Sequence, residues 1–298
     1  MENFILIFLT IFIGYFLNRL SIFPQDSAIT LNKFVIFISL PAMIFLQIPK
    51  LTLSFDIVIP IVISWCVILL SAITIFFLSK LMNFSKEITG ALLLVGVLTN
   101  SSFLGIPIIE AFYGGDALPY VMVYDQLGTF LALATYGTFI ASYYSAKTQI
   151  TFSMIVYKII TFPPFIALIL SLFFIGVEFP TPIKSVLSSL AATIVPVALV
   201  AVGLQLQFKL PKNDLKPFGI ALTTKLIFAP IIAIIICTIF SWNNLASQVS
   251  ILEAAMAPMI TAGAMASMAG LAPRLSSAIV GYGAIISFLT TYIFYRLI

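Results

Sequence analysis

A polar cluster followed by a proline interrupts the apolar stretch 88–112. The cluster is Thr99-Asn100-Ser101-Ser102, and Gly105-Ile106-Pro107 follows it. Proline lacks a backbone N–H and clashes with the preceding turn, so we expect the helix to break or kink at Pro107. Lipid cannot hydrogen-bond to the freed backbone groups, whereas a partner helix or a water-filled cavity can. Half-helix ends of this kind form substrate sites in secondary transporters; a simple kink, with Ser and Thr bonded to their own helix, is the alternative.

A second stretch, 252–264, also combines a proline with small residues. Pro258 precedes Thr261-Ala262-Gly263, where few side chains are large. Small residues allow helix backbones to cross closely, so tight packing alone would explain them. Two weakened helices in corresponding halves of a chain are, however, the best sequence indication of a transporter's binding site. The candidates for a substrate site are therefore Asn100, Ser101, Ser102, Gly105, Pro107, Thr261, Ala262 and Gly263.

Three ionisable side chains inside apolar segments are candidates for coupling, because a charge within a membrane is costly. Lys225 and Glu253 lie at similar depths, since a helix rises about 1.5 Å per residue and the hydrocarbon core is about 30 Å thick. An ion pair between them would be either a structural tie or a switch linked to a proton or to substrate. Asp125, beside Gln126, is either a proton carrier or a solvated acid in a wet vestibule.

The composition indicates a polytopic helical membrane protein. Of the 298 residues, 62% are hydrophobic and 8% are charged, and the mean hydropathy is +1.20; soluble domains carry about 25% charged residues. The chain has no histidine, which excludes a histidine triad, a histidine-ligated metal and a histidine proton relay. Cys66 and Cys237 lie in apolar runs, so no disulfide is expected. We predict no catalytic residue, metal, cofactor or nucleic-acid partner.

The apolar segments predict ten membrane-spanning helices, each with roughly the 17–25 residues that a tilted helix needs. They cover 3–20, 29–48, 56–79, 88–112, 118–143, 152–176, 183–207, 216–240, 246–270 and 274–297. We interpret the first as a retained span, because it lacks the basic start of a signal peptide. Ten of the fourteen basic residues lie in loops after odd-numbered segments. Since basic loops face the cytoplasm, this predicts a plasma (inner) membrane protein with both termini extracytoplasmic.

The two halves of the chain, 1–143 and 152–298, show a weak similarity. Pro41 and Pro196 lie at corresponding positions of the second and seventh segments, 155 residues apart. Each half contains five predicted helices. An odd number of helices turns the second half over in the membrane, which gives an inverted repeat, a recurrent transporter architecture.

Several motifs resemble the auxin efflux carrier family, which includes the plant PIN exporters and many bacterial permeases. The most specific motif is Asn100-Ser101-Ser102-Phe103-Leu104-Gly105-Ile106-Pro107; Phe162-Pro163-Pro164 and Pro196-Val197-Ala198-Leu199 also match. The resemblance covers essentially the whole chain. It implies an all-α fold of ten transmembrane helices in two inverted five-helix repeats. The broken fourth and ninth helices would cross, as in bile-acid symporters and sodium/proton antiporters.

The resemblance also implies how the helices divide. Helices one, two, six and seven would form a scaffold bundle, and helices three to five and eight to ten a transport bundle. Asn100 matches the crossover asparagine of the fourth helix. Where plant members have a crossover proline in the ninth helix, this chain has about Ala262, and the paired acidic residues typical of sodium/proton antiporters are missing.

We therefore expect a secondary-active or facilitative transporter of a small organic anion, auxin-like or a carboxylate, that works by elevator-like alternating access. A sodium-coupled symporter is the alternative, followed by a channel or receptor. An enzyme is not expected, because the chain lacks a Walker motif, and Tyr124-Asp125 lacks the second motif of an intramembrane aspartyl protease. The expected partners are the anion and the lipid bilayer; proton coupling and a homodimer stay open.

Overall fold

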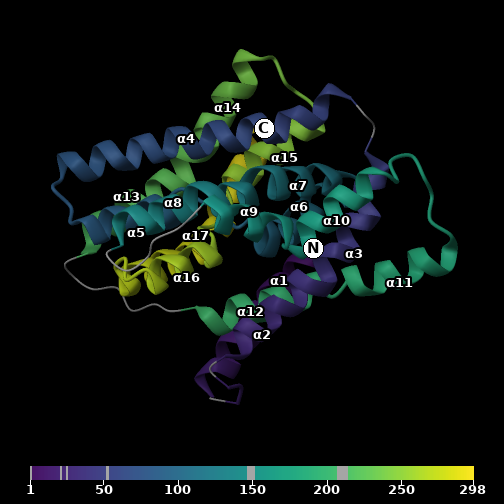
Figure 1. The fold of residues 1–298 in the computed structure, drawn as a ribbon, viewed down its shortest axis with the longest axis horizontal. Helices are drawn as coiled ribbons and strands as arrows, with labels where there is room; N and C mark the ends of the chain where they lie inside the picture. The colour runs from purple at the N-terminus through teal and green to yellow at the C-terminus, as the bar shows by residue number, and fades with distance from the viewer. Residues whose placement is uncertain (1, 21, 25, 52–53, 146–151, 207–213) are drawn as a thin grey trace.

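The computed structural model describes the chain except residues 1, 21, 25, 52–53, 146–151 and 207–213. Within this described part the structure is helical, and its one isolated β-bridge joins Thr99 and Pro258. Figure 1 shows long helices that pack side by side in a bundle. The predicted cytoplasmic residues Lys147, Lys209 and Lys212 lie outside the described residues.

Five of the predicted spans are continuous helices that are long and apolar enough to cross a membrane. They correspond to the second, third, seventh, eighth and tenth predicted segments, which are confirmed as helices. Their elements are α2 (Ser27–Phe34) with the π-helix η1 (Val35–Ser39), α3 (Leu40–Gln47) and η2 (Ile48–Lys50); η3 (Phe55–Ile57) with α4 (Val58–Leu81); α11 (Thr181–Ala191) with α12 (Ile194–Gln205); α13 (Leu215–Thr223) with the π-helix η9 (Thr224–Phe228) and α14 (Ala229–Ile239); and α17 (Pro273–Leu297).

The first predicted span is the single helix α1 (Glu2–Arg19), and the remaining four are divided into shorter pieces. Proline and glycine explain several divisions, because neither continues a helix well. The pieces are α5 (Lys86–Val95), η4 (Ser101–Gly105) and α6 (Ile106–Tyr113); η5 (Gly115–Ala117), α7 (Leu118–Val123), η6 (Tyr124–Phe130), η7 (Leu133–Gly137) and α8 (Thr138–Tyr144); α9 (Phe152–Ile160) and α10 (Pro163–Leu172); and α15 (Leu245–Ala254) and α16 (Ile260–Met268).

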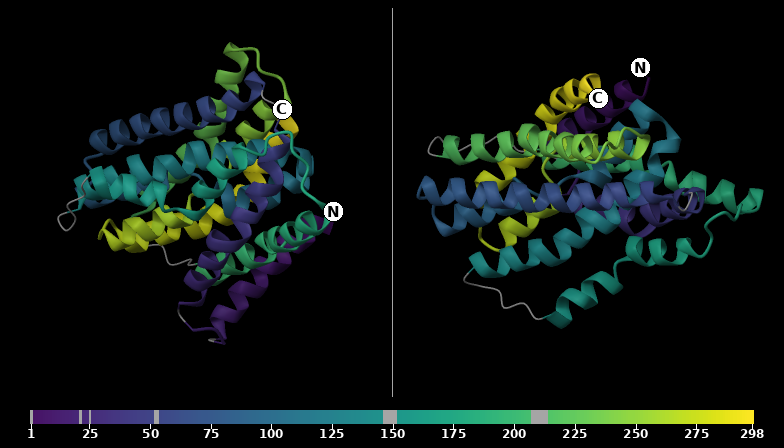
Figure 2. Two further views of the ribbon diagram at one scale, coloured as in Figure 1. Left: turned by 45° about the vertical axis from the view of Figure 1, so that its right-hand side comes forward. Right: turned by 90° about the horizontal axis from the view of Figure 1, so that it is seen from above.

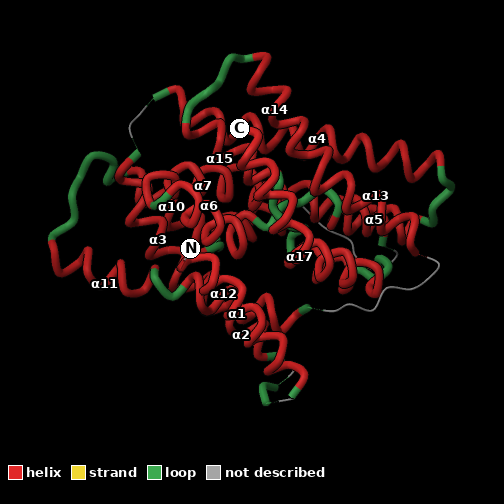
Figure 3. Tube along the Cα trace, turned by 180° about the vertical axis from the view of Figure 1, so that it is seen from behind, coloured by secondary structure: helices red, strands yellow, loops and turns green. Residues whose placement is uncertain are grey.

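Helices α1, α2 and α12 form a group at one side of the bundle, as Figures 1 and 2 show. Gly14 and Gly203 lie where α1 and α12 meet, and a Cβ atom on either residue would collide with the backbone of the other helix. Small residues at a crossing allow this close approach, which favours helix association within a membrane. On the other side of the molecule α5, α13 and α17 pack against one another (Figure 3).

The two halves of the chain are joined in the interior. The hydroxyl groups of Ser39 and Thr193, near the middle of two long helices, lie 2.7 Å apart and are hydrogen-bonded. The largest buried apolar cluster includes Ile44 of α3, Leu199 of α12 and Ile108 of α6. This cluster packs helices from both halves of the chain against one another.

Candidate functional site

The first broken helix is interrupted at 96–100, which includes Thr99 and Asn100 of the polar cluster, and not at the proline. Helix α5 ends at Val95, and helical structure resumes at Ser101. Asn100 caps the new helix, because its side-chain oxygen accepts a hydrogen bond from the backbone N–H of Phe103 at 3.3 Å. The predicted break at Pro107 is therefore wrong: this residue lies in the continuous helical piece Ser101–Tyr113.

A π-helical turn explains why Pro107 does not break the helix. The backbone N–H of Gly105 donates to the carbonyl of Asn100 at 3.1 Å, which is an i to i−5 bond. The wider π turn shifts the hydrogen-bond register just before the proline. As a result, the absence of a backbone N–H at Pro107 destabilises this helix less than it would destabilise a regular α-helix.

The second broken helix is interrupted at 255–259, and its unwound segment crosses the first one. The backbone N–H of Asn100 donates to the carbonyl of Ala257, and that of Met259 donates to the carbonyl of Leu98, both at 2.9 Å. Each break thus satisfies the backbone groups that the other exposes, as buried backbone requires. Pro258, not Ala262, lies at the crossing, so the predicted absence of a crossover proline is wrong.

A small cavity of about 90 Å³ adjoins the crossing. The side-chain nitrogen of Asn100 is buried and has no hydrogen-bond partner among the described residues, although its oxygen is bonded. Asn100 borders this cavity, so an unused donor is available beside an empty space. The cavity is lined by Ile36, Leu40, Asn100, Ser102, Phe103, Asp125, Gln126, Phe130, Leu133, Phe162, Met259 and Thr261.

Asp125 lies in the π-helix η6 and organises the polar side of this cavity. One carboxylate oxygen accepts hydrogen bonds from the hydroxyls of Ser101 at 2.5 Å and Ser102 at 2.6 Å. The other oxygen accepts from the side-chain nitrogen of Gln126 at 2.6 Å. Charge-assisted bonds of this kind are roughly twice as strong as neutral ones. Asp125 therefore fixes the start of the second half-helix, and four predicted site residues meet here.

The other two predicted charges lie deeper. The ammonium of Lys225 donates to the backbone carbonyl of Ala254 at 2.8 Å, and Lys225 is fully buried. Glu253 is also fully buried, and within the described part of the chain neither of its carboxylate oxygens has a hydrogen-bond partner. The suggested ion pair is thus not hydrogen-bonded in this structure.

The carboxylate of Glu253 instead lies beside Gly105 of the first broken helix. A Cβ atom built on Gly105 would lie 2.5 and 2.6 Å from the two carboxylate oxygens, so a larger residue there would require the Glu253 side chain to move. Two buried carboxylates, Asp125 and Glu253, therefore contact the same short segment, Ser101–Gly105. One of these acids comes from each half of the chain.

The remaining predicted site residues are dispersed. Ala262 is buried in an apolar cluster and lines neither cavity described here, while Pro107 is buried in the helix that follows the crossing. Gly263 lines a second cavity of about 530 Å³. The sequence reasoning missed the apolar wall of the small cavity, of which Phe162 was the detectable member, because it precedes the Pro163-Pro164 pair.

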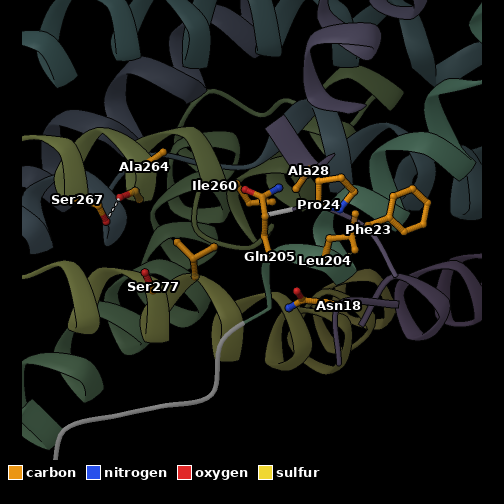
Figure 4. Close-up of a pocket in the computed structure, with 12 residues that line it drawn as sticks. Asn18, Phe23, Pro24, Ala28, Leu204, Gln205, Ile260, Ala264, Ser267 and Ser277 are labelled. Carbon is orange, nitrogen blue, oxygen red and sulfur yellow. Dashed lines mark hydrogen bonds between the residues drawn. The ribbon is translucent and has the colours of Figure 1, made fainter. Parts of the chain in front are cut away.

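The larger cavity lies between the helices α1, α2 and α12 on one side and α16 and α17 on the other. Figure 4 shows the amide side chains of Asn18 and Gln205 on one side, and Ser277 and Ser267 on the other; Ser267 donates to the carbonyl of Gly263 at 2.9 Å. The described residues that line it are Asn18, Phe23, Pro24, Ala28, Leu204, Gln205, Ile260, Gly263, Ala264, Ser267, Ser277 and Val280. Among these described residues, none carries a charge.

The chain is similar to proteins described as membrane transporters. The chain matches the family described as membrane transport protein over residues 1–295. It is 26% identical over 268 residues to an uncharacterized transporter of Methanothermobacter thermautotrophicus, which covers 89% of this chain and 87% of the relative. It is also 26% identical over 265 residues to an uncharacterized transporter of Methanocaldococcus jannaschii, with 86% and 85% covered.

Proposed function

This chain belongs to the family of membrane transport proteins, and we propose that it is a secondary transporter of a small organic anion. With its apolar helices it is an integral, multi-pass membrane protein. The family fits the auxin efflux carrier resemblance of the sequence, and it indicates transport rather than catalysis. The anion would be a carboxylate or an auxin-like acid that moves across the membrane by alternating access.

The proposed architecture is two inverted five-helix repeats, 1–143 and 152–298, with both termini extracytoplasmic. The crossing of the two broken helices through paired backbone bonds supports it, as does the contact between Ser39 and Thr193, at nearly corresponding positions of the two halves. Helices one, two, six and seven would be the scaffold. The remaining helices would move against this scaffold, elevator-like, because alternating access in folds with inverted repeats moves one bundle against the other.

The unused amide donor of Asn100 is the observation that carries the substrate proposal. It lies at the N-terminus of a half-helix, where backbone N–H groups and the helix dipole favour an anion. The small cavity of about 90 Å³ has room for little more than a carboxylate group, since a water molecule takes about 30 Å³. The remainder of the substrate would extend toward the larger cavity, because both cavities border the first turns of α16.

A ligand-stabilisation screen tests this function. Purified protein is heated with malonate, succinate or indole-acetate, at two pH values and with sodium or choline as the cation. A ligand that binds only the folded state raises the unfolding temperature as its concentration exceeds its dissociation constant. We expect a carboxylate to do so, and the corresponding uncharged amide to have no effect. Stabilisation by the amides alone would contradict an anion site.

A sodium-coupled symporter is the second candidate. The unpartnered carboxylate oxygens of Glu253 favour it, because oxygen ligands suit hard cations. Dependence of carboxylate binding on sodium in the same screen would support this version. Dependence on pH without dependence on sodium would favour proton coupling.

A further inference from the structure

The C-terminal end of α15 points its carbonyl groups into the centre of the protein. Such carbonyls have no partner within their own helix and carry the negative end of the helix dipole. The carbonyl of Glu253 accepts from the backbone N–H of Met256 at 3.1 Å. The carbonyl of Ala254 accepts from the ammonium of Lys225. A positive charge is thus placed at the negative end of the broken helix.

The first broken helix ends in a different way. Near the end of α5, the carbonyl of Leu93 accepts a hydrogen bond from the hydroxyl of Tyr136 at 2.8 Å. That donor is neutral, whereas the donor at α15 is a cation. Lys225 is the one fully buried basic side chain in the described part of the chain. The positive charge is therefore specific to the second half of the crossover.

Lys225 also interacts with Glu253, and Glu253 interacts in turn with the other buried acid, Asp125. The Lys225 ammonium and the Glu253 carboxylate attract each other through space, and the Asp125 carboxylate repels that of Glu253. Asp125 is already satisfied by three hydrogen bonds. Glu253 is fully buried, and no described residue donates a hydrogen bond to its carboxylate, so a negative charge on it depends on a nearby cation.

We propose that the Lys225 ammonium is a built-in counter-ion of the crossover, which takes the place of an inorganic cation beside Glu253 and the end of α15. The position of Lys225 supports this inference, since the π-helical turn η9 (Thr224–Phe228) carries it in the middle of the long helix Leu215–Ile239, where its side chain is fully buried. The carrier then needs no sodium at the crossover. Only the conclusion about sodium-independent transport rests on the proposed function. The counter-ion itself is tested without substrate, so the two can fail separately.

The test is the thermal unfolding of purified protein in choline, sodium or methylammonium chloride at equal ionic strength and pH. The wild type should unfold at the same temperature in all three salts. Lys225→Ala should unfold roughly 6–20 °C lower in choline, because it leaves a buried charge unpaired. Sodium or methylammonium should restore part of that loss by occupying the vacated position. Lys216→Ala, at an exposed position of α13, is the matched control and should show no dependence on the cation.

Two results would overturn the inference. One is specific stabilisation of the wild type by sodium, and the other is a Lys225→Ala variant that unfolds at the same temperature in all three salts. The double variant Lys225→Ala with Glu253→Gln removes both charges and should not respond to cations. If Lys225→Ala cannot be isolated, folding of this double variant supports the counter-ion. If the double variant does not fold either, the ammonium serves only as a structural hydrogen-bond donor to the carbonyl of Ala254, and the inference is overturned.

Discussion

Replacement of Gly283 by alanine should displace the crossover. Gly283 lies in α17, and a Cβ atom on it would be 2.5 Å from the Cδ atom and 2.7 Å from the Cγ atom of Pro258. Carbon atoms pack best at about 3.5–4.0 Å, so the proline ring must move by about 1 Å. The ring is rigid and lies in the bridge with Thr99, and therefore the movement strains the backbone bonds between the two broken helices.

Overpacking of this kind costs about 1–3 kcal/mol, which in a protein of comparable size lowers the unfolding temperature by roughly 2–12 °C. The assay is thermal unfolding of the purified protein in detergent. Gly219→Ala in α13 is the matched control, because nothing lies within 4 Å of the added Cβ atom; alanine in a helix should be neutral or stabilising by about 1 kcal/mol. If Gly283→Ala unfolds at the same temperature as Gly219→Ala, the packing of Pro258 against α17 does not hold the crossing in place.

Three further predictions concern topology and stability. Cysteines at Lys86 and Asn243, both exposed, should react with membrane-impermeant reagents from opposite sides, and reaction from one side would exclude the ten-span arrangement. Asn244→Ala should destabilise the protein by about 0.5–2 kcal/mol, since Asn244 caps α15 and bonds to Asp56 at 2.5 Å; an unchanged denaturation midpoint would contradict this. Asp125→Ala should lower the unfolding temperature more than Asn244→Ala, because three hydrogen bonds to a charged group are lost, and an equal or smaller loss would show that the network is weak.

The sequence predicted the helices well because apolar length is a direct physical requirement of a membrane span. Two interruptions were also predicted in the right segments. Their exact positions were not, because the effect of a proline depends on the local hydrogen-bond register. Pro107 follows a π turn and stays helical, whereas Pro258 lies in the bridge at the crossing.

The site was predicted in part, for a similar reason. Asn100 is where the sequence placed it, and Ser101, Ser102, Asp125 and Gln126 meet beside it. The spacing of residues along the sequence could not predict which distant segments contact each other. The depths of Lys225 and Glu253 along their helices suggested that the two residues would form an ion pair. Depth alone could not show that the Lys225 ammonium donates to the carbonyl of Ala254 and not to the Glu253 carboxylate.

The most direct test of the proposed anion site is the dissociation constant of the tightest-binding carboxylate in the Asn100→Ser variant. Serine caps a helix about as well as asparagine does and adds no buried charge, so folding should be retained, while the free amide donor is lost. Loss of one hydrogen bond to a charged group costs about 1.5–3 kcal/mol, which weakens binding more than tenfold. Asn243→Ser, at an exposed position, is the control and should bind normally. We predict a more than tenfold weaker affinity for Asn100→Ser at an unchanged unfolding temperature; an unchanged dissociation constant would contradict a substrate site at the crossover.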